Sequence, residues 1–193
     1  DETTRKYMGT LWNTYAFFIL YAEIDQFNPK EHPLDKAELT LMDRWILSRL
    51  NSLVREVDDD LNEYKIFEAS RAMTDFVDDL SNWYVRRSRE RFWGKGMAGD
   101  KEAAFATLYH VLETMSRLTA PFTPFMAENM YRNLVCSVDK DAPISVHMTD
   151  FPVCDERYIN TELEQHMRDL LEVVVLGRSC RSESGLKERQ PLS

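Results

Sequence analysis

The residues with the clearest chemistry lie between positions 82 and 95, where arginines are interleaved with aromatic side chains. The cations of this stretch, which we call the basic cluster, are Arg86, Arg87, Arg89, Arg91 and Lys95. With Glu90 as the only acid among them, the local charge is about +4, whereas the whole chain carries −9. Guanidinium groups form paired hydrogen bonds with phosphates, and an exposed ring such as that of Trp93 stacks on unpaired bases. The stretch therefore suits an anionic partner.

A second interpretation of the basic cluster is purely structural. Cations are favoured near the C-terminal end of a helix by its dipole, and the acidic remainder of the chain offers many carboxylates for pairing. From the residues alone we place this structural interpretation slightly ahead of binding to an anionic partner. Trp83 and Tyr84 fall on the apolar side of the expected helix, which predicts packing, whereas Trp93 lies just beyond it and suits surface stacking.

The elements that position the basic cluster are predicted from apolar residues recurring three and four positions apart. This periodicity predicts helices over about residues 3–24, 39–61, 66–92, 100–118, 124–135 and 161–176. We expect Asp100, Thr123 and the box that starts at Thr161 to cap the last three helices. Residues 144–148 suit a short extended segment. The predicted fold class is all-α, an elongated bundle of about six helices with the basic cluster on the last two turns of the third.

Composition limits the function further. A chain of 193 residues with 44% hydrophobic and 30% charged residues is typical of a soluble globular protein. Its three cysteines are far apart, and neither they nor the four histidines have metal-ligand spacing, so we expect no metal site. No Glu-x-x-His motif supports a carboxylate-bound metal enzyme. The longest apolar run has eight residues, whereas a membrane span needs about 20, so we expect no membrane contact. The odd number and wide spacing of the cysteines fit a reducing, cytoplasmic location.

We expect two parts in this chain. Residues 1–177 form the helical domain, and residues 178–193 form a loosely ordered basic tail that leads into a missing C-terminal region. The cations of this tail are Arg178, Arg181, Lys187 and Arg189. Because the chain begins with Asp1 and has no evident terminal signals, we interpret it as a piece of a longer protein.

Several segments, in order along nearly the whole chain, resemble motifs of the isoleucyl-tRNA synthetase family. They are TLWNTYAFF (10–18), DRWILS (43–48), SNWYVRRSR (81–89) with RFW (91–93), LTAPFTPFMAE (118–128) and SVH (145–147). The tail LKERQPL (186–192) resembles the segment that follows the helical bundle in isoleucine enzymes. Together these motifs are specific for class I synthetases of the isoleucine, valine, leucine and methionine group, and they match the anticodon-binding helical domain.

The resemblance implies a parent enzyme that joins isoleucine to its tRNA with ATP and Mg in a separate catalytic domain. That domain's His-x-Gly-His and Lys-Met-Ser-Lys-Ser motifs are absent here, as is the editing insertion, so we expect no catalytic residue and no cofactor in this chain. A zinc ion would belong to the missing C-terminal region. The implied partners are isoleucine tRNA and the catalytic domain of the same chain, with no DNA. We expect RNA contact from the basic cluster, Trp93 and the basic tail.

Three alternatives remain open. Trp83, Tyr84, Arg86 and Arg87 also suit an interface with the catalytic domain, because they lie at the end of a long helix. A helical interaction domain without an RNA role would show the same acidic surface and the same apolar periodicity. Within the resemblance itself, a sister synthetase for valine, leucine or methionine is the neighbouring alternative.

Overall fold

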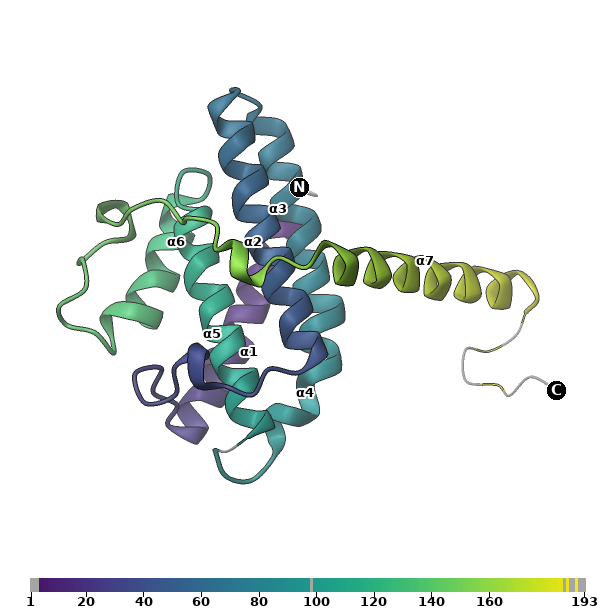
Figure 1. Ribbon diagram of the computed structural model, residues 1–193, viewed down its shortest axis with the longest axis horizontal. Coiled ribbons are helices and arrows are strands. Elements are labelled where there is room, and N and C mark those ends of the chain that lie inside the picture. The colour runs from purple at the N-terminus through teal and green to yellow at the C-terminus, as the bar shows by residue number, and fades with distance from the viewer. Residues whose placement is uncertain (1–3, 98, 186, 188–189, 191–193) are drawn as a thin grey trace. The chain divides into compact units, whose positions relative to one another are not determined.

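The structure is a computed structural model that describes residues 4–97, 99–185, 187 and 190 (Figure 1). By contacts between residues the chain divides into a first unit, residues 1–159, and a second unit, residues 160–193. The described residues form helices and loops and contain no β-strand, which confirms the all-α prediction. The division differs from the predicted boundary between residues 177 and 178, which falls inside a helix.

Among the described residues, six α-helices belong to the first unit and one to the second. They are α1 (Thr10–Asp25), α2 (Leu41–Asn62), α3 (Ile66–Asp78), α4 (Arg86–Trp93), α5 (Asp100–Leu118), α6 (Pro124–Tyr131) and α7 (Thr161–Glu183). Three π-helical segments adjoin them, at Thr4–Gly9, Asp79–Val85 and Arg132–Cys136. Short 3-10 turns lie at Leu34–Lys36, Val146–Met148 and Glu156–Tyr158.

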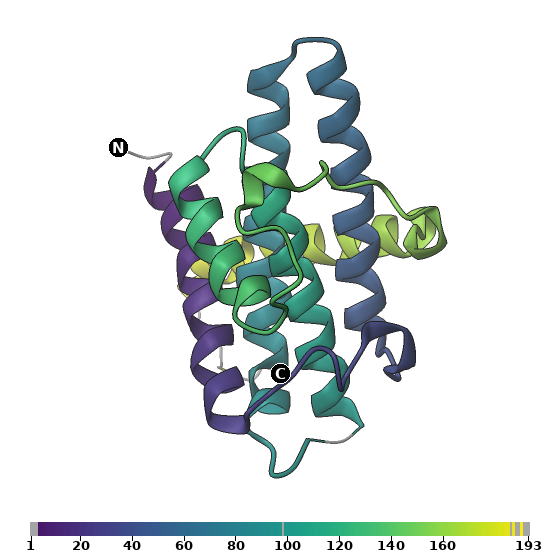
Figure 2. The same ribbon diagram turned by 90° about the vertical axis from the view of Figure 1, so that its left-hand side faces the viewer.

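Helices α2 and α3 form an antiparallel hairpin, which both views show side by side (Figures 1 and 2). Their apolar stripes face each other and are buried, as at Trp45 and Val57 on α2 and at Met73 and Phe76 on α3. Burying one such side chain contributes about 1.5–3 kcal/mol relative to leaving it exposed. The hairpin is therefore held by the periodic apolar residues from which it was predicted.

The helix predicted as one element over residues 66–92 is a continuous helical stretch made of α3, a π-helical segment and α4. Its buried side continues at every fourth residue through Leu80, Tyr84, Ser88 and Phe92. In a regular α-helix such residues drift around the axis, because one turn holds 3.6 residues. The wider π-helical turn offsets part of that drift, and it keeps α4 packed on the core. Counting this stretch as one helix gave the predicted number of six.

Helix α5 lies at the centre of the first unit, among α1, α2, α4 and α6 (Figure 2). Its side chains are buried on nearly all sides, including Phe105, Leu108 and Leu112. The ring centroids of Phe92 and Phe105 are 4.9 Å apart, and those of Phe17 and Phe92 are 5.2 Å apart. These rings join α1, α4 and α5 directly behind the basic cluster.

Several predicted helix ends differ from the structure. Asp100 is the first residue of α5 rather than its cap, which is Gly99. Thr123 occupies the N-cap position of α6, as predicted, but its side chain makes no capping hydrogen bond. The segment expected to be extended over residues 144–148 contains the 3-10 turn Val146–Met148. Short polar side chains near a boundary are typical of caps and of first turns alike, so their spacing did not decide between them.

The second unit also corrects two predictions. Helix α7 is capped by Asn160, whose Oδ1 accepts from the Leu163 backbone N–H at 3.0 Å, instead of by the box at Thr161. It runs through Gly177 to Glu183, so the first residues of the predicted loose tail are helical. A glycine inside a helix costs only about 1 kcal/mol, and its neighbours continue the helix here.

Candidate nucleic-acid interface

Helix α4 presents most of the basic cluster on its outer side. Arg86, Arg89 and Trp93 follow one another at steps of three and four residues and so share one face of the helix. Arg86 and Arg89 are exposed, and among the described residues neither forms a salt bridge with a carboxylate. Ser88 and Phe92 occupy the opposite, buried side. The interleaved sequence thus separates into a cationic outer face and an apolar inner face.

Trp93 is exposed and yet held in place. The residue is 57% exposed, and its indole Nε1 donates a hydrogen bond to the Tyr21 hydroxyl of α1 at 2.8 Å. The Tyr21 ring lies 4.9 Å from that of Phe17, which in turn packs edge-on against Phe92. This chain of contacts fixes the indole next to the exposed arginines, as an aromatic platform for a base would require.

The end of α4 is anchored by a buried lysine at the start of α5. Lys101 is only 6% exposed, and its ammonium group donates to the Gly94 carbonyl at 2.7 Å. It also forms a 2.7 Å ion pair with Asp25 of α1 and lies 5.7 Å from the centre of the Phe105 ring. The ammonium group lies at the C-terminal end of α4, where the dipole of that helix favours a cation. It fixes the backbone between Trp93 and Lys95, and Lys95 itself is exposed.

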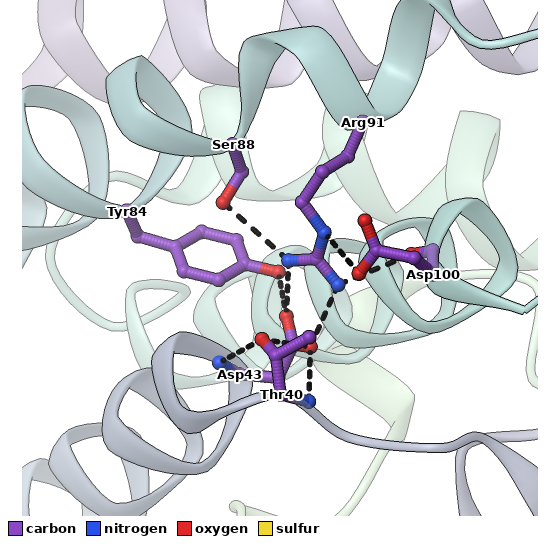
Figure 3. A network of polar contacts seen from close by, with 6 residues as sticks. All are labelled: Thr40, Asp43, Tyr84, Ser88, Arg91 and Asp100. Atoms are coloured by element: carbon purple, nitrogen blue, oxygen red, sulfur yellow. Dashed lines mark hydrogen bonds and ion pairs between the residues drawn. The ribbon is translucent and has the colours of Figure 1, made fainter.

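Arg91 has surroundings opposite to those of the other arginines (Figure 3). Its guanidinium forms two parallel hydrogen bonds with the fully buried Asp43 carboxylate, NH1 to Oδ1 at 2.8 Å and NH2 to Oδ2 at 2.7 Å. The Tyr84 hydroxyl donates to Asp43 Oδ1 at 2.6 Å. Arg91 Nε lies 2.8 Å from Asp100 Oδ1, and NH2 also donates to the Asp100 carbonyl at 3.1 Å. The Arg91 charge is therefore balanced by carboxylates within the protein.

The start of α2 supplies the remaining contacts of this network. Asp43 Oδ2 accepts from the Thr40 backbone N–H at 2.9 Å and from the Thr40 hydroxyl at 2.7 Å, which completes a capping box. The network therefore joins the beginning of α2, the inner side of α4 and the beginning of α5 (Figure 3). A carboxylate buried with this many donors is satisfied, whereas the same carboxylate without them would be strongly destabilising.

The protonation states in the network follow from burial and hydrogen bonding. Burial acts to raise the pKa of the Asp43 carboxyl, but donors from Arg91, Tyr84 and Thr40 outweigh it and hold this pKa below its ordinary value. Burial, reinforced by the Asp43 charge, holds the pKa of the Tyr84 hydroxyl well above its ordinary value. Burial acts to lower the pKa of Arg91, yet its bonds to Asp43 raise it overall. At neutral pH the network is a buried ion pair with a neutral tyrosine.

The structure thus divides the predicted site. Arg86, Arg87, Arg89, Trp93 and Lys95 lie on or beside the outer face of α4, whereas Arg91 lies in the network beneath it. Sequence reasoning missed Asp43 and the Tyr84 hydroxyl as its partners. The Thr40-x-x-Asp43 spacing is a capping signal, but nothing local indicates a partner 48 positions away.

Of the residues considered for a domain interface, Tyr84 is fully buried and so does not reach another domain. Trp83 is half-buried, and the Arg87 guanidinium lies 5.9 Å from the centre of its ring. This distance is within the range of a cation–π contact, which leaves one face of the guanidinium outward. Trp83, Arg86 and Arg87 therefore remain accessible to either an RNA or a protein.

The cations of the predicted tail belong to the second unit. Arg178 and Arg181 lie on the last turns of α7, and Arg181 NH1 donates to the carbonyls of Lys187 and Gln190, both at 2.9 Å. Arg189 lies outside the described residues. Arg181 is therefore hydrogen-bonded to Lys187 and Gln190 beyond the end of α7, and Lys187 is exposed.

Two further findings concern the described residues only. None of their helices is long and apolar enough to cross a lipid bilayer. No group of three or more histidine, cysteine, aspartate or glutamate side chains among them is placed to hold a metal ion.

Comparison with known proteins gives one family and many relatives. Residues 43–193 match the family model described as the anticodon-binding domain of tRNA ligase. The chain is 52% identical over 192 residues to an isoleucine–tRNA ligase of Clostridium novyi (strain NT), covering 100% of this chain and 18% of that protein. It is 50% identical over 193 residues to that of Clostridium tetani (strain Massachusetts / E88), with 100% and 18% covered.

A relative from another genus gives the same result. The isoleucine–tRNA ligase of Dehalococcoides mccartyi (strain ATCC BAA-2266 / KCTC 15142 / 195) is 52% identical over 192 residues, 100% of this chain and 19% of that protein. The chain thus spans less than a fifth of the length of the curated relatives it matches. Because the family model covers well over half of its residues, the chain belongs to the anticodon-binding domain family of tRNA ligases.

Proposed function

We propose that this chain binds the anticodon stem and loop of isoleucine tRNA as one domain of a longer isoleucine–tRNA ligase. Family membership supports tRNA binding, and the names of the relatives support isoleucine as the amino acid. The single observation that carries the proposal to particular residues is the outer face of α4, with three exposed arginines beside a fixed, exposed indole. Cations on phosphates and a ring on an unpaired base are the contacts that single-stranded RNA loops require.

Each side chain has a role in this proposal. Arg86, Arg87, Arg89 and Lys95 contact backbone phosphates, and Trp93 stacks on a base of the loop. Arg91 touches no RNA and instead holds α4 against α2 and α5 through Asp43. The tail cations Arg178, Arg181, Lys187 and Arg189 supply further charge. A net charge of −9 confines RNA to these basic positions, because carboxylates elsewhere repel the phosphates.

The chemistry of the longer enzyme belongs to its other domains. ATP and Mg would bind in a catalytic domain of the same polypeptide, which would join isoleucine to the tRNA in the cytoplasm. Zinc, where the longer enzyme has it, would belong to a C-terminal region. The role of this chain is then to hold the anticodon end so that the acceptor end reaches that catalytic domain.

The proposal is tested by the affinity of the protein for isoleucine tRNA and valine tRNA across a salt series. Replacing Arg86, Arg87 and Arg89 together by Ala is expected to weaken binding and to flatten the salt dependence by about one unit of slope per lost phosphate contact. A matched control replaces three exposed cations elsewhere in the first unit, Lys36, Arg44 and Lys140. Equal losses for both variants would show that only net charge matters, and unchanged binding would remove α4 from the interface.

A further inference from the structure

The end of α2, the turn after it and the start of α3, residues 58–68, have features that the folding of the first unit does not explain. We call this segment the hairpin tip (Figures 1 and 2). Three large apolar side chains stand out into solvent there, with exposed fractions of 88% for Tyr64, 59% for Ile66 and 74% for Phe67. Single exposed apolar residues are ordinary, but three within four positions form a patch, and such patches mark contact sites.

The backbone conformation at Tyr64, within the hairpin tip, is unfavourable for a tyrosine. Just beyond the end of α2, Tyr64 is in the left-handed region, at φ 60°, and the Lys65 N–H donates back to the Asp60 carbonyl at 2.8 Å. Glycine, or less often asparagine, normally occupies this position of a helix end, because a Cβ is strained there. The exposed Tyr64 ring gains no packing within the described residues that would offset this strain.

The charges of the hairpin tip are also unfavourable for helix stability. Between residues 58 and 68 the chain has one cation, Lys65, and five carboxylates, those of Asp58, Asp59, Asp60, Glu63 and Glu68. Lys65 is paired with Glu63. The three aspartates lie in the last turns of α2, where the helix dipole disfavours negative charge. Folding of the hairpin therefore explains neither the apolar patch, nor Tyr64, nor these carboxylates, and local rules are broken in this way mainly at functional surfaces.

We propose that the hairpin tip is a docking surface for another domain of the same longer polypeptide, one that offers an apolar hollow bordered by lysine or arginine. This inference rests on the proposed function, in which the chain is one domain of a longer ligase. The acidic border selects a basic protein surface and repels RNA, so the hairpin tip and α4 serve different partners.

The small size of the patch favours a partner within the same polypeptide. Two separate proteins usually bury about 800 Å² on each side of a stable interface, and three apolar side chains with their acidic border offer much less. Within one chain the linked domain is present at an effective concentration in the millimolar range, at which a small contact suffices. The relatives leave room for this domain, because this chain spans 18% of their length.

The test uses hydroxyl-radical oxidation of the longer ligase, read by mass spectrometry at Tyr64 and Phe67 and normalised to the same protein unfolded in urea. In the absence of tRNA we expect both rings to be oxidised about fivefold more slowly than in the unfolded chain, since interface cores exclude solvent. A variant with Asp58, Asp59 and Asp60 all replaced by Lys is expected to lose this protection. We expect this variant to fold, because the helix dipole favours cations near the C-terminal end of a helix.

Matched controls separate the alternatives. Replacing the exposed carboxylates of Glu23, Glu38 and Asp150 by Lys gives the same change in net charge away from the hairpin tip and is expected to leave the protection intact. Protection that is absent in the wild type, that appears only with tRNA, or that depends on protein concentration overturns the proposal. The last two results would assign the surface to RNA or to a second copy. Binding of tRNA by the same samples tests the proposed function separately.

Discussion

The two ends of α2 lie in opposite surroundings. At its beginning, the capping box of Thr40 and Asp43 is completed by Arg91 and Tyr84, and every polar group of the buried carboxylate has a partner. At its end, Tyr64 is strained and exposed amid carboxylates that the helix dipole disfavours. The first end is built for stability. The second end has a surface that the stability of the hairpin does not require.

The largest expected effect comes from removing the buried carboxylate. Asp43→Ala is expected to lower the free energy of unfolding by about 3–5 kcal/mol, because Arg91 loses the carboxylate to which it makes paired hydrogen bonds and the buried Tyr84 hydroxyl loses its acceptor. Urea unfolding of both proteins measures this difference. Arg89→Ala, on the exposed face of the same helix, is the control and is expected to change stability by less than about 0.5 kcal/mol. Equal effects of the two substitutions would contradict the comparison.

Replacing the guanidinium while keeping its charge is expected to have a smaller effect. Arg91→Lys preserves the cation but loses the paired hydrogen bonds to Asp43 and the contact with Asp100, so we expect a loss of about 1–3 kcal/mol in the free energy of unfolding. Arg86→Lys, at the exposed position, serves as the matched control and is expected to change little. If Arg91→Lys were as stable as the wild type, charge alone would hold the network together.

The pH dependence gives a test of intermediate size. The pKa of the Asp43 carboxyl is lower in the folded protein than in the unfolded chain. Its contribution to the free energy of unfolding is therefore fully present above the pKa of the unfolded chain, about 4, and is lost as the pH falls through the folded pKa. The stability difference between wild type and Asp43→Asn, followed by urea unfolding at several pH values, is therefore expected to shrink at acid pH.

Asp79 serves as a control for this measurement, because its stability contribution is expected to change with pH in the opposite direction. Burial raises its pKa despite the neighbouring Arg49, so the wild type is expected to lose stability relative to Asp79→Asn as the pH rises past about 4. The same sign for both aspartates would show that the acid response belongs to the protein's overall charge and not to these two sites.

The smallest expected effect is at the other end of α2. Tyr64→Asn is expected to raise the free energy of unfolding by about 0.5–1 kcal/mol, since asparagine tolerates the left-handed conformation better than tyrosine does. Thermal unfolding of this chain measures it, with Tyr64→Phe as a control that keeps the strain and is expected to be neutral. A destabilised Tyr64→Asn protein would mean that the tyrosine ring packs within the fold after all.

Much of the fold was predictable because the local periodicity of apolar residues indicates where helices form. The apolar residues of α2 and α5 recur at helical spacing, and both helices lie within about two residues of their predicted positions. The π-helical segment before α4 was not predicted, because its residues also suit an α-helix and only packing on the core rewards the wider turn. The continuation of α7 through Gly177 was missed because glycine there was interpreted as an end signal.

The candidate site was predictable as a set of residues but not as an arrangement. Arg89 and Arg91 are two positions apart and chemically identical, yet one is exposed and the other is bound to Asp43. Helical spacing places them on different sides of α4 once the buried side is known. Which side is buried, and which carboxylate lies beneath it, depends on α2 and α5, which are distant in sequence.

The sequence by itself determined the fold class, the family resemblance and the presence of a basic, aromatic stretch in an acidic chain, because composition and periodicity are local properties. Only the tertiary structure decided which cations face solvent and which are paired inside. It also revealed that Tyr64 is left-handed and exposed at the hairpin tip. The physical reason is that burial, and with it the energy of a charge or a ring, is set by neighbours that folding brings together from far along the chain.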